Sequence, residues 1–212
     1  MAQWQLVDTR PDGPALEAAV RDLFAGDGTI YLVTGFFTEA AYGDLRREIE
    51  RFLDRSPSNH LEVLVTPSAD QIAKAIVRDL RADFEDQVGL WTYPGRFVHA
   101  KLYLRDGPEP VAIIGSANLT RGAFRYNLEV ALVVEGDGPD DPAVTPYRDW
   151  VTSVLADARP LARRDLATPV RVARMVRNWT AKGRLIPPDQ LAGRLRTVAV
   201  GLLGALALAW LI

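Results

Sequence analysis

The 212-residue chain contains no cysteine, only two histidines and only three lysines. Without cysteine, disulfide bonds and thiolate metal sites are excluded, and the absence agrees with a reducing compartment. Because lysine is so scarce among the 25 basic residues, arginine carries nearly all of the positive charge. The net charge of -2 argues against broad nonspecific adhesion to nucleic acid or anionic lipid, although a local basic groove is compatible with it.

Both ends of the sequence are informative through what they lack. The first residues have no basic start followed by an apolar core, so we expect no secretory signal and a cytoplasmic domain. Residues 197–212 contain no charged residue and would span ~24 Å as a helix, somewhat less than a ~30 Å hydrocarbon core. Arg194 and Arg196 precede this tail, as expected on the cytoplasmic side of a membrane. Two interpretations remain open, an anchor in the inner membrane and a hydrophobic helix packed in a core or a dimer interface.

Segments with an apolar spacing near 3.6 alternate with short β-rich runs along the first 136 residues. The expected helices are 13–26, 38–55 and 68–84, and the expected strands are 29–37, 61–67, 88–93, 97–106, 110–118 and 127–136. This order predicts an α/β fold in which helices sandwich a mixed β-sheet. We expect a main domain at 1–144, a helical extension at 145–193 and an apolar tail at 194–212.

The stretch VHAKLYLRD, residues 98–106, combines scarce residue types at the spacing of a strand. Because side chains alternate along a strand, we expect His99, Lys101 and Tyr103 on one face and apolar side chains on the other. An imidazole beside an ammonium is a poor structural pair, but it suits an anion that is being attacked. Asp106 ends the strand, where its carboxylate either supports the site or simply forms a turn.

The stretch GSAN belongs to the next expected strand, which a turn brings back beside the first. Ser116 and Asn118 share a face, and Gly115 allows a close approach of backbone or ligand. A hydroxyl, an amide and an ammonium that converge on one point match the needs of phosphoryl oxygens. We therefore predict one pocket that holds His99, Lys101, Ser116 and Asn118.

Together, these two stretches resemble the signature of the phospholipase D superfamily, His-x-Lys with a downstream Asp followed by Gly-Ser-x-Asn. The matching residues are His99, Lys101, Asp106, Gly115, Ser116 and Asn118. The interval between Asp106 and Gly115 is longer than is usual in the family, so we expect a longer hairpin. Glu129 is similar to the family's downstream acid, which orients the catalytic histidine. The resemblance covers roughly residues 15–136 and implies a phospholipase D-like catalytic domain within 1–144.

The resemblance implies a two-step displacement at a phosphodiester, with no metal and no cofactor. One histidine attacks phosphorus and forms a phosphohistidine, and a second protonates the leaving oxygen and then activates water. Lys101 and Asn118 would stabilise charge on the equatorial oxygens. The chain carries the motif once, and His60 lacks the accompanying residues, so we interpret His60 as structural. We predict a homodimer in which two His99 side chains face one phosphate.

With its single motif, the chain resembles those family members that dimerise, which are small nonspecific endonucleases and the catalytic domains of some metal-independent restriction enzymes. We therefore predict a nuclease. The helical extension carries arginines that either meet a phosphate backbone or form a solvated face: Arg159, Arg163, Arg164, Arg171, Arg174 and Arg177. Arg121 and Arg125 either line a phosphate entrance or cover a short helix. The alternative is a phospholipid phosphodiesterase or transphosphatidylase that residues 197–212 hold against a bilayer. A noncatalytic scaffold is disfavoured by the intact set of motif residues.

Overall fold

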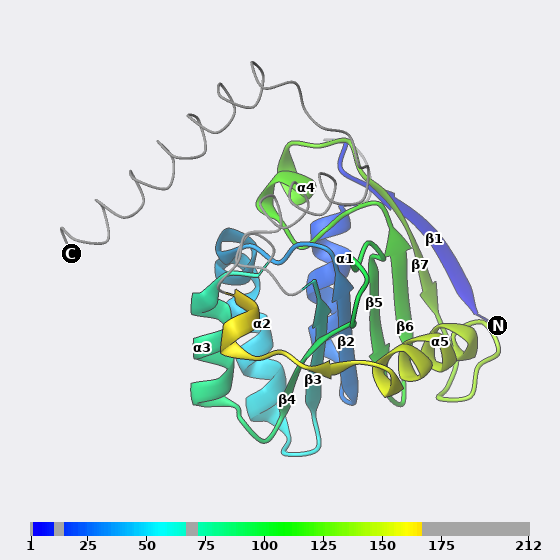
Figure 1. Ribbon diagram of the computed structural model, residues 1–212. Helices are drawn as coiled ribbons and strands as arrows, with labels where there is room; N and C mark the ends of the chain where they lie inside the picture. The colour runs from blue at the N-terminus through cyan, green and yellow to red at the C-terminus, as the bar shows by residue number, and fades with distance from the viewer. Residues whose placement is uncertain (1, 11–14, 67–71, 167–212) are drawn as a thin grey trace, which may run out of the picture. The chain divides into compact units, whose positions relative to one another are not determined.

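The computed structural model describes residues 2–10, 15–66 and 72–166, which all belong to one compact unit that runs from Met1 to Val170 (Figure 1). Its strands are β1 (Gln3–Asp8), β2 (Thr29–Thr34), β3 (His60–Val65), β4 (Val88–Thr92), β5 (Leu102–Asp106), β6 (Val111–Gly115), β7 (Val130–Glu135) and β8 (Arg159–Pro160). Its helices are α1 (Leu16–Asp22), α2 (Glu39–Arg55), α3 (Lys74–Asp83), α4 (Arg121–Arg125) and α5 (Thr145–Ala156), with 3₁₀ turns η1 (Leu23–Ala25) and η2 (Arg163–Leu166).

The strands form one sheet in the order β1-β7-β6-β5-β2-β3-β4-β8. Strands β2, β3 and β4 are parallel, as expected for strands joined by crossover helices. Strands β5, β6, β7 and β1 are antiparallel neighbours, and β5 joins the two halves by pairing antiparallel with β2. The predicted α/β fold with a mixed sheet is therefore confirmed.

Helices α1, α2 and α3 cover one face of the sheet (Figure 1). Helix α2 places Leu45, Ile49 and Phe52 at a helical spacing, and all three side chains are fully buried in the core on this face. Thr38 caps the helix, because its hydroxyl accepts a hydrogen bond from the Ala41 amide at 3.4 Å. This bond fixes the residue at which α2 begins.

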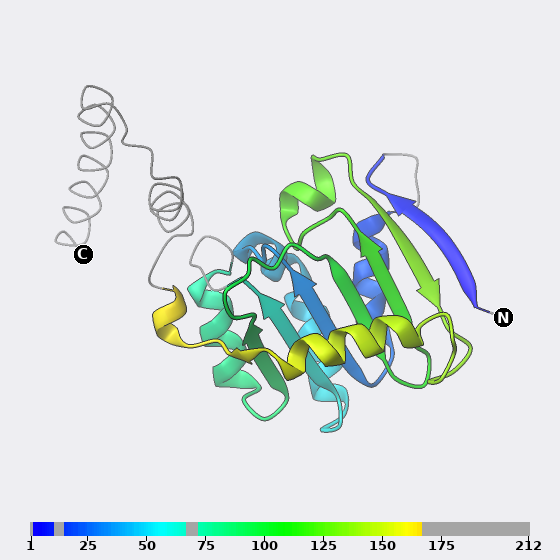
Figure 2. The same cartoon turned by 45° about the vertical axis from the view of Figure 1, so that its right-hand side comes forward.

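Helix α5 crosses the opposite face of the sheet (Figure 2). Its fully buried Val151 joins a second apolar cluster, to which β5, β6 and β7 contribute Leu102, Leu104, Ala112 and Val134. Beyond this helix, β8 pairs with β4 and forms one edge of the sheet. The predicted boundary at residue 144 therefore falls inside the compact unit, because α5 packs on this sheet and β8 belongs to it.

Two strands differ from the sequence expectations. Strand β1 was not predicted, and it pairs antiparallel with β7 as an edge strand whose Trp4 and Leu6 side chains are exposed. Strand β5 begins only at Leu102, so His99 and Lys101 lie on the extended segment before it. The antiparallel β5–β6 pair confirms the predicted hairpin.

Most of the predicted helical extension and the whole apolar tail, residues 197–212, lie outside the described residues. None of the helices within the described ranges combines the length and the apolar character that crossing a membrane requires. Helix α3 begins at Lys74, whereas the predicted start at Ser68 also lies outside these ranges.

Candidate active site

His99 lies on an extended segment that is attached to the end of β3. The buried Thr66 hydroxyl accepts a hydrogen bond from the Val98 amide at 2.8 Å. The His99 ring is exposed and packs at a centroid distance of 6.1 Å from Phe97. Neither ring nitrogen is hydrogen-bonded to another residue in the described part of the chain, so the imidazole is free to meet a ligand.

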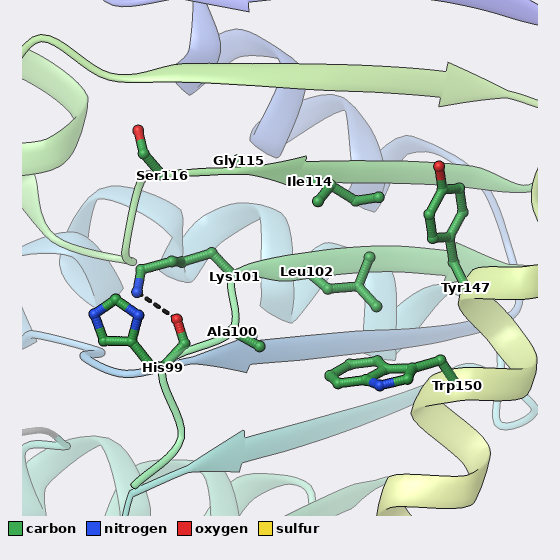
Figure 3. A pocket seen from close by; sticks show the side chains of 9 residues that line it. All are labelled: His99, Ala100, Lys101, Leu102, Ile114, Gly115, Ser116, Tyr147 and Trp150. Atoms are coloured by element: carbon green, nitrogen blue, oxygen red, sulfur yellow. Dashed lines mark hydrogen bonds between the residues drawn. The ribbon is translucent and has the colours of Figure 1, made fainter.

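Lys101 is mostly buried, with 9% of its surface exposed. Its Nζ donates a hydrogen bond to the His99 carbonyl oxygen at 2.5 Å, which holds the ammonium beside the imidazole (Figure 3). Burial lowers the pKa of Lys101, and the negative charge of Glu129 partly opposes this shift. No carboxylate of the described residues lies within ion-pair distance of Nζ, so the positive charge remains available to an anion.

Ser116 follows β6 and comes beside Lys101 because the two strands pair. The Gly115 amide donates to the Lys101 carbonyl at 3.4 Å, next to the Leu102–Ile114 pair. A Cβ atom on Gly115 would overlap the Val130 carbonyl of β7. Glycine is therefore needed at this position for β7 to approach closely, as the sequence suggested.

Glu129 holds Ser116 rather than His99. The Ser116 hydroxyl donates to Glu129 Oε2 and accepts from the Val130 amide at 3.2 Å. Asn127 Nδ2 donates to the other carboxylate oxygen, Oε1, at 3.2 Å. Both oxygens of Glu129 thus accept hydrogen bonds from Ser116 and Asn127. Within one copy of the chain, Glu129 does not hydrogen-bond His99, so it does not orient the histidine as the family resemblance implies.

Thr9, which the sequence analysis overlooked, fixes the loop that carries Glu129. Its hydroxyl accepts from the Glu129 amide at 3.0 Å and donates to the Asn127 carbonyl at 2.7 Å. Thr9 directly follows β1, so the unpredicted edge strand anchors this side of the site. The alternation in QWQLVD was the available signal for that strand.

Asn118 lies deeper, at the end of β2. Its Oδ1 lies 3.3 Å from the fully buried Thr34 hydroxyl, which also has the Phe36 carbonyl as an acceptor at 3.0 Å. A Cβ atom on Gly35 would approach this Oδ1 to 3.2 Å, so Gly35 leaves room for the amide. The Asn118 amide nitrogen has no hydrogen-bond partner among the described residues. Asn118 is close to the predicted pocket but does not line it.

Asp106 lies at the opposite end of β5 from His99 and Lys101. It pairs with Thr29, the first residue of β2, and on the other side of Thr29 lies His60. Lys101 and Asp106 are five positions apart along the chain, which corresponds to roughly 17 Å in an extended strand. The structure therefore does not bring Asp106 into the predicted pocket, and it places His60 at the same remote end of the strands, as expected of a structural histidine.

A pocket of about 500 Å³ lies over β5 and β6 and under α5 (Figure 3). The polar side chains at one end are His99, Lys101 and Ser116, and the opposite end is apolar. The complete lining is His99, Ala100, Lys101, Leu102, Ile114, Gly115, Ser116, Tyr147 and Trp150. Three of the four predicted pocket residues thus lie together, whereas the aromatic wall from α5 was not predicted.

The arginines that follow Asn118 are held in ion pairs. Arg121 on α4 donates twice to Asp44, at 2.8 and 2.7 Å. Arg125 contacts Glu17 at 3.4 Å and Asp44 at 3.7 Å. These contacts favour the interpretation that both arginines cover a short helix and tie it to α1 and α2.

The arginines predicted to form a basic face are mostly undescribed. Arg159 is paired with Asp165 at 2.7 Å. For Arg163 and Arg164 the backbone alone is described, and Arg171, Arg174 and Arg177 lie outside the described residues.

Comparison with known proteins assigns the chain to a family. Residues 43–154, more than half of the chain, match the family model described as cardiolipin synthase, PLD-like domain. The chain belongs to the phospholipase D-like family. This phospholipase D-like domain contains the segments that carry His99, Lys101, Ser116, Asn118 and Glu129 within the matched range.

Solved structures share the fold at low sequence identity. Nuc of Salmonella typhimurium is 16% identical, with a TM-score of 0.57 over 76% of this chain and 98% of that chain. NucT of Helicobacter pylori is 15% identical, with a TM-score of 0.58 over 76% of this chain and 99% of that chain.

Phosphatidylserine synthase of Haemophilus influenzae has the same fold in part of a longer chain. It is 15% identical, with a TM-score of 0.61 over 85% of this chain but only 46% of that chain. No curated protein sequence is significantly similar to this chain.

Proposed function

We propose that this phospholipase D-like protein is a metal-independent nuclease that cleaves phosphodiesters through a phosphohistidine. The supporting observation is the polar end of the pocket, where the unbonded His99 ring and the unpaired Lys101 ammonium lie together. A nucleophile and an uncompensated positive charge in one partly enclosed site are suited to a phosphoryl group. The likeness to Nuc and NucT over almost their entire length agrees with a small enzyme of this kind.

In this proposal, a ring nitrogen of His99 attacks phosphorus while the bond to the leaving oxygen breaks. A second imidazole gives its proton to that oxygen, then takes a proton from the water that attacks the phosphohistidine. The products are the released alcohol and a phosphomonoester, and both histidines return to their starting state. Lys101, the Asn118 amide and the Ser116 hydroxyl would stabilise the charge on the equatorial oxygens.

The second imidazole requires a second copy of the chain. His60 begins β3, at the end of the strands that is remote from His99, so the described chain offers no other histidine to the pocket. We propose a symmetric homodimer in which two exposed His99 rings face one phosphate. Apolar side chains beside Glu129 support a protein contact there, because Tyr126 and Leu128 expose 79% and 81% of their surfaces.

A phospholipid phosphodiesterase or transphosphatidylase is the second candidate. The apolar end of the pocket favours it, because Leu102, Ile114 and Trp150 would tolerate an acyl or glycerol group. The fold match to phosphatidylserine synthase agrees with this alternative.

Three parallel assays separate these candidates. Purified full-length protein is incubated in EDTA with single-stranded DNA, with single-stranded RNA and with vesicles of labelled phosphatidylglycerol. We expect nucleic-acid cleavage that resists EDTA, disappears in His99→Ala and persists in His60→Ala, which removes the histidine at the remote end of the strands. Release of lipid products without nucleic-acid cleavage would overturn the nuclease proposal in favour of the second candidate.

A further inference from the structure

Two aromatic side chains of α5 form the wall of the pocket opposite the sheet. Tyr147 and Trp150 are three residues apart, so they lie on the same side of the helix above Leu102 and Ile114. The indole of Trp150 extends from α5 toward Ala100, in the direction of His99 (Figure 3). Trp150 exposes 42% of its surface, so its side chain is not buried in the core.

This aromatic wall is continuous with the polar end that holds His99, Lys101 and Ser116. A phosphate at the polar end would therefore place one of its ester groups along the wall. The pocket volume of about 500 Å³ falls in the usual range for a site that accepts a small organic group. The wall would thus contact the group that is covalently attached to the phosphorus.

Positive charge contributes little to this part of the site. Arg148, which lies between the two aromatic residues in sequence, points to Asp106, with Nε 2.7 Å from the carboxylate. Arg121 is likewise paired with Asp44. Among the described pocket residues, the only side chains that carry or can gain positive charge are His99 and Lys101. Binding beyond the phosphate must therefore depend on the aromatic and apolar surfaces rather than on contacts with a long phosphate backbone.

We propose that Tyr147 and Trp150 hold the unpaired nucleobase next to the scissile phosphate, so that single-stranded nucleic acid is the substrate class. The inference rests on the proposed nuclease function. Flat aromatic faces stack on any base, whereas a base within a duplex is already stacked and cannot enter the pocket. Tyrosine and tryptophan also present a polar atom at the ring edge, which suits a base better than an acyl chain.

The test measures both binding and cleavage in the full-length protein. A labelled single-stranded oligonucleotide, the matching duplex and the same single strand with abasic residues are titrated against His99→Ala protein. We expect the single strand to bind more tightly than either competitor. Adding Trp150→Ala weakens single-strand binding by about 5- to 100-fold, whereas Trp150→Phe, which keeps a flat ring, retains most of it.

Trp4→Ala is the matched control, because Trp4 is an exposed tryptophan of β1 that does not line the pocket. In otherwise wild-type protein, we expect Trp150→Ala to lower kcat/KM on single strands, with Trp4→Ala unchanged. Equal binding of single strand, duplex and abasic strand would overturn the stacking inference while leaving the nuclease proposal intact.

Cleavage of phosphatidylglycerol vesicles alone would instead overturn the nuclease proposal. If Trp150→Ala then raised KM for the vesicles, the pocket would be assigned to lipid and the nucleobase inference would fail with it. Loss of folded structure in Trp150→Ala, seen by circular dichroism, transfers the comparison to Trp150→Leu, which fills space without a flat ring. Weaker single-strand binding by folded Trp150→Leu than by Trp150→Phe would support the inference, and equal binding by the two would overturn it.

Discussion

Asp106 Oδ1 accepts a hydrogen bond from Arg148 Nε at 2.7 Å and thereby ties the end of β5 to α5. Arg148 also donates to the Pro139 carbonyl on the loop before this helix. Both side chains of the Asp106–Arg148 pair are largely shielded from water, with 24% and 21% exposed. The aspartate of the motif thus acts on the helix that carries Tyr147 and Trp150, at the far end of the strand from His99.

We predict that Asp106→Ala lowers the free energy of unfolding by about 1–3 kcal/mol, because a charge-assisted hydrogen bond is lost. Arg148→Ala should have a similar cost, and the double variant should cost less than the sum of both. Urea denaturation of the four proteins measures this coupling. The phosphohistidine step should persist in Asp106→Ala. Loss of that step equal to the loss in His99→Ala, with unchanged stability, would instead assign Asp106 to the chemistry.

A homodimeric site makes His99→Ala a dominant inhibitor. If each site needs two His99 rings, a mixed dimer is inactive, so only wild-type dimers contribute to turnover. After equilibration with about a tenfold excess of His99→Ala, we expect activity per wild-type chain to fall about tenfold. Nuclease assays after co-refolding or prolonged mixing measure this effect.

The control for that experiment is an equal excess of His60→Ala protein. It should not inhibit the wild-type protein, because its His99 is intact. Leu128→Glu introduces a charge on the exposed apolar loop beside Glu129, and we expect it to produce an inactive monomer by light scattering. An active monomer at the assay concentration would contradict the two-copy site.

The pH dependence of the first step should report on Lys101. Burial lowers the pKa of this ammonium from its ordinary value of 10.5. The ammonium is present below its pKa and is lost as the pH rises through it, so activity should decline on the alkaline side below pH 10.5. Bis(p-nitrophenyl) phosphate isolates this effect, because its leaving group needs no proton and kcat/KM extends only to phosphohistidine formation. The profile is measured from about pH 6 to about pH 11.

Lys101→Arg supplies the comparison for that profile. Its guanidinium stays charged across this range, so the alkaline decline should disappear even though the planar group lowers the rate. Lys101→Ala should lower kcat/KM by about 100-fold or more. An unchanged alkaline decline in Lys101→Arg would show that another group causes it.

Much of the sheet could be predicted because its signals are local. The hairpin of β5 and β6 follows from alternating residues around a Gly-Pro turn, and α2 follows from its apolar spacing and its Thr38 cap. Strand β1 was overlooked because an edge strand with exposed Trp4 and Leu6 does not show the buried apolar run that marks the central strands.

The arrangement of the site was harder to predict because it depends on neighbours that are distant in sequence. The hairpin accounts for Lys101 and Ser116 lying together. The bond from Ser116 to Glu129 depends instead on β7 lying beside β6, and Thr9 reaches the same loop only because β1 pairs with β7. Residues 67–71 and 167–212 lie outside the described part of the chain, and the predicted anchor at 197–212 is among them.

The sequence by itself determined which reactive side chains are present and which segments pair with their neighbours along the chain, because both depend on residue type and short-range periodicity. Only the tertiary structure decided that Asp106 supports α5, that Glu129 binds Ser116, and that Tyr147 and Trp150 line the same pocket as His99. Those relationships depend on strand order and register across the sheet, where packing between distant segments outweighs the local pattern.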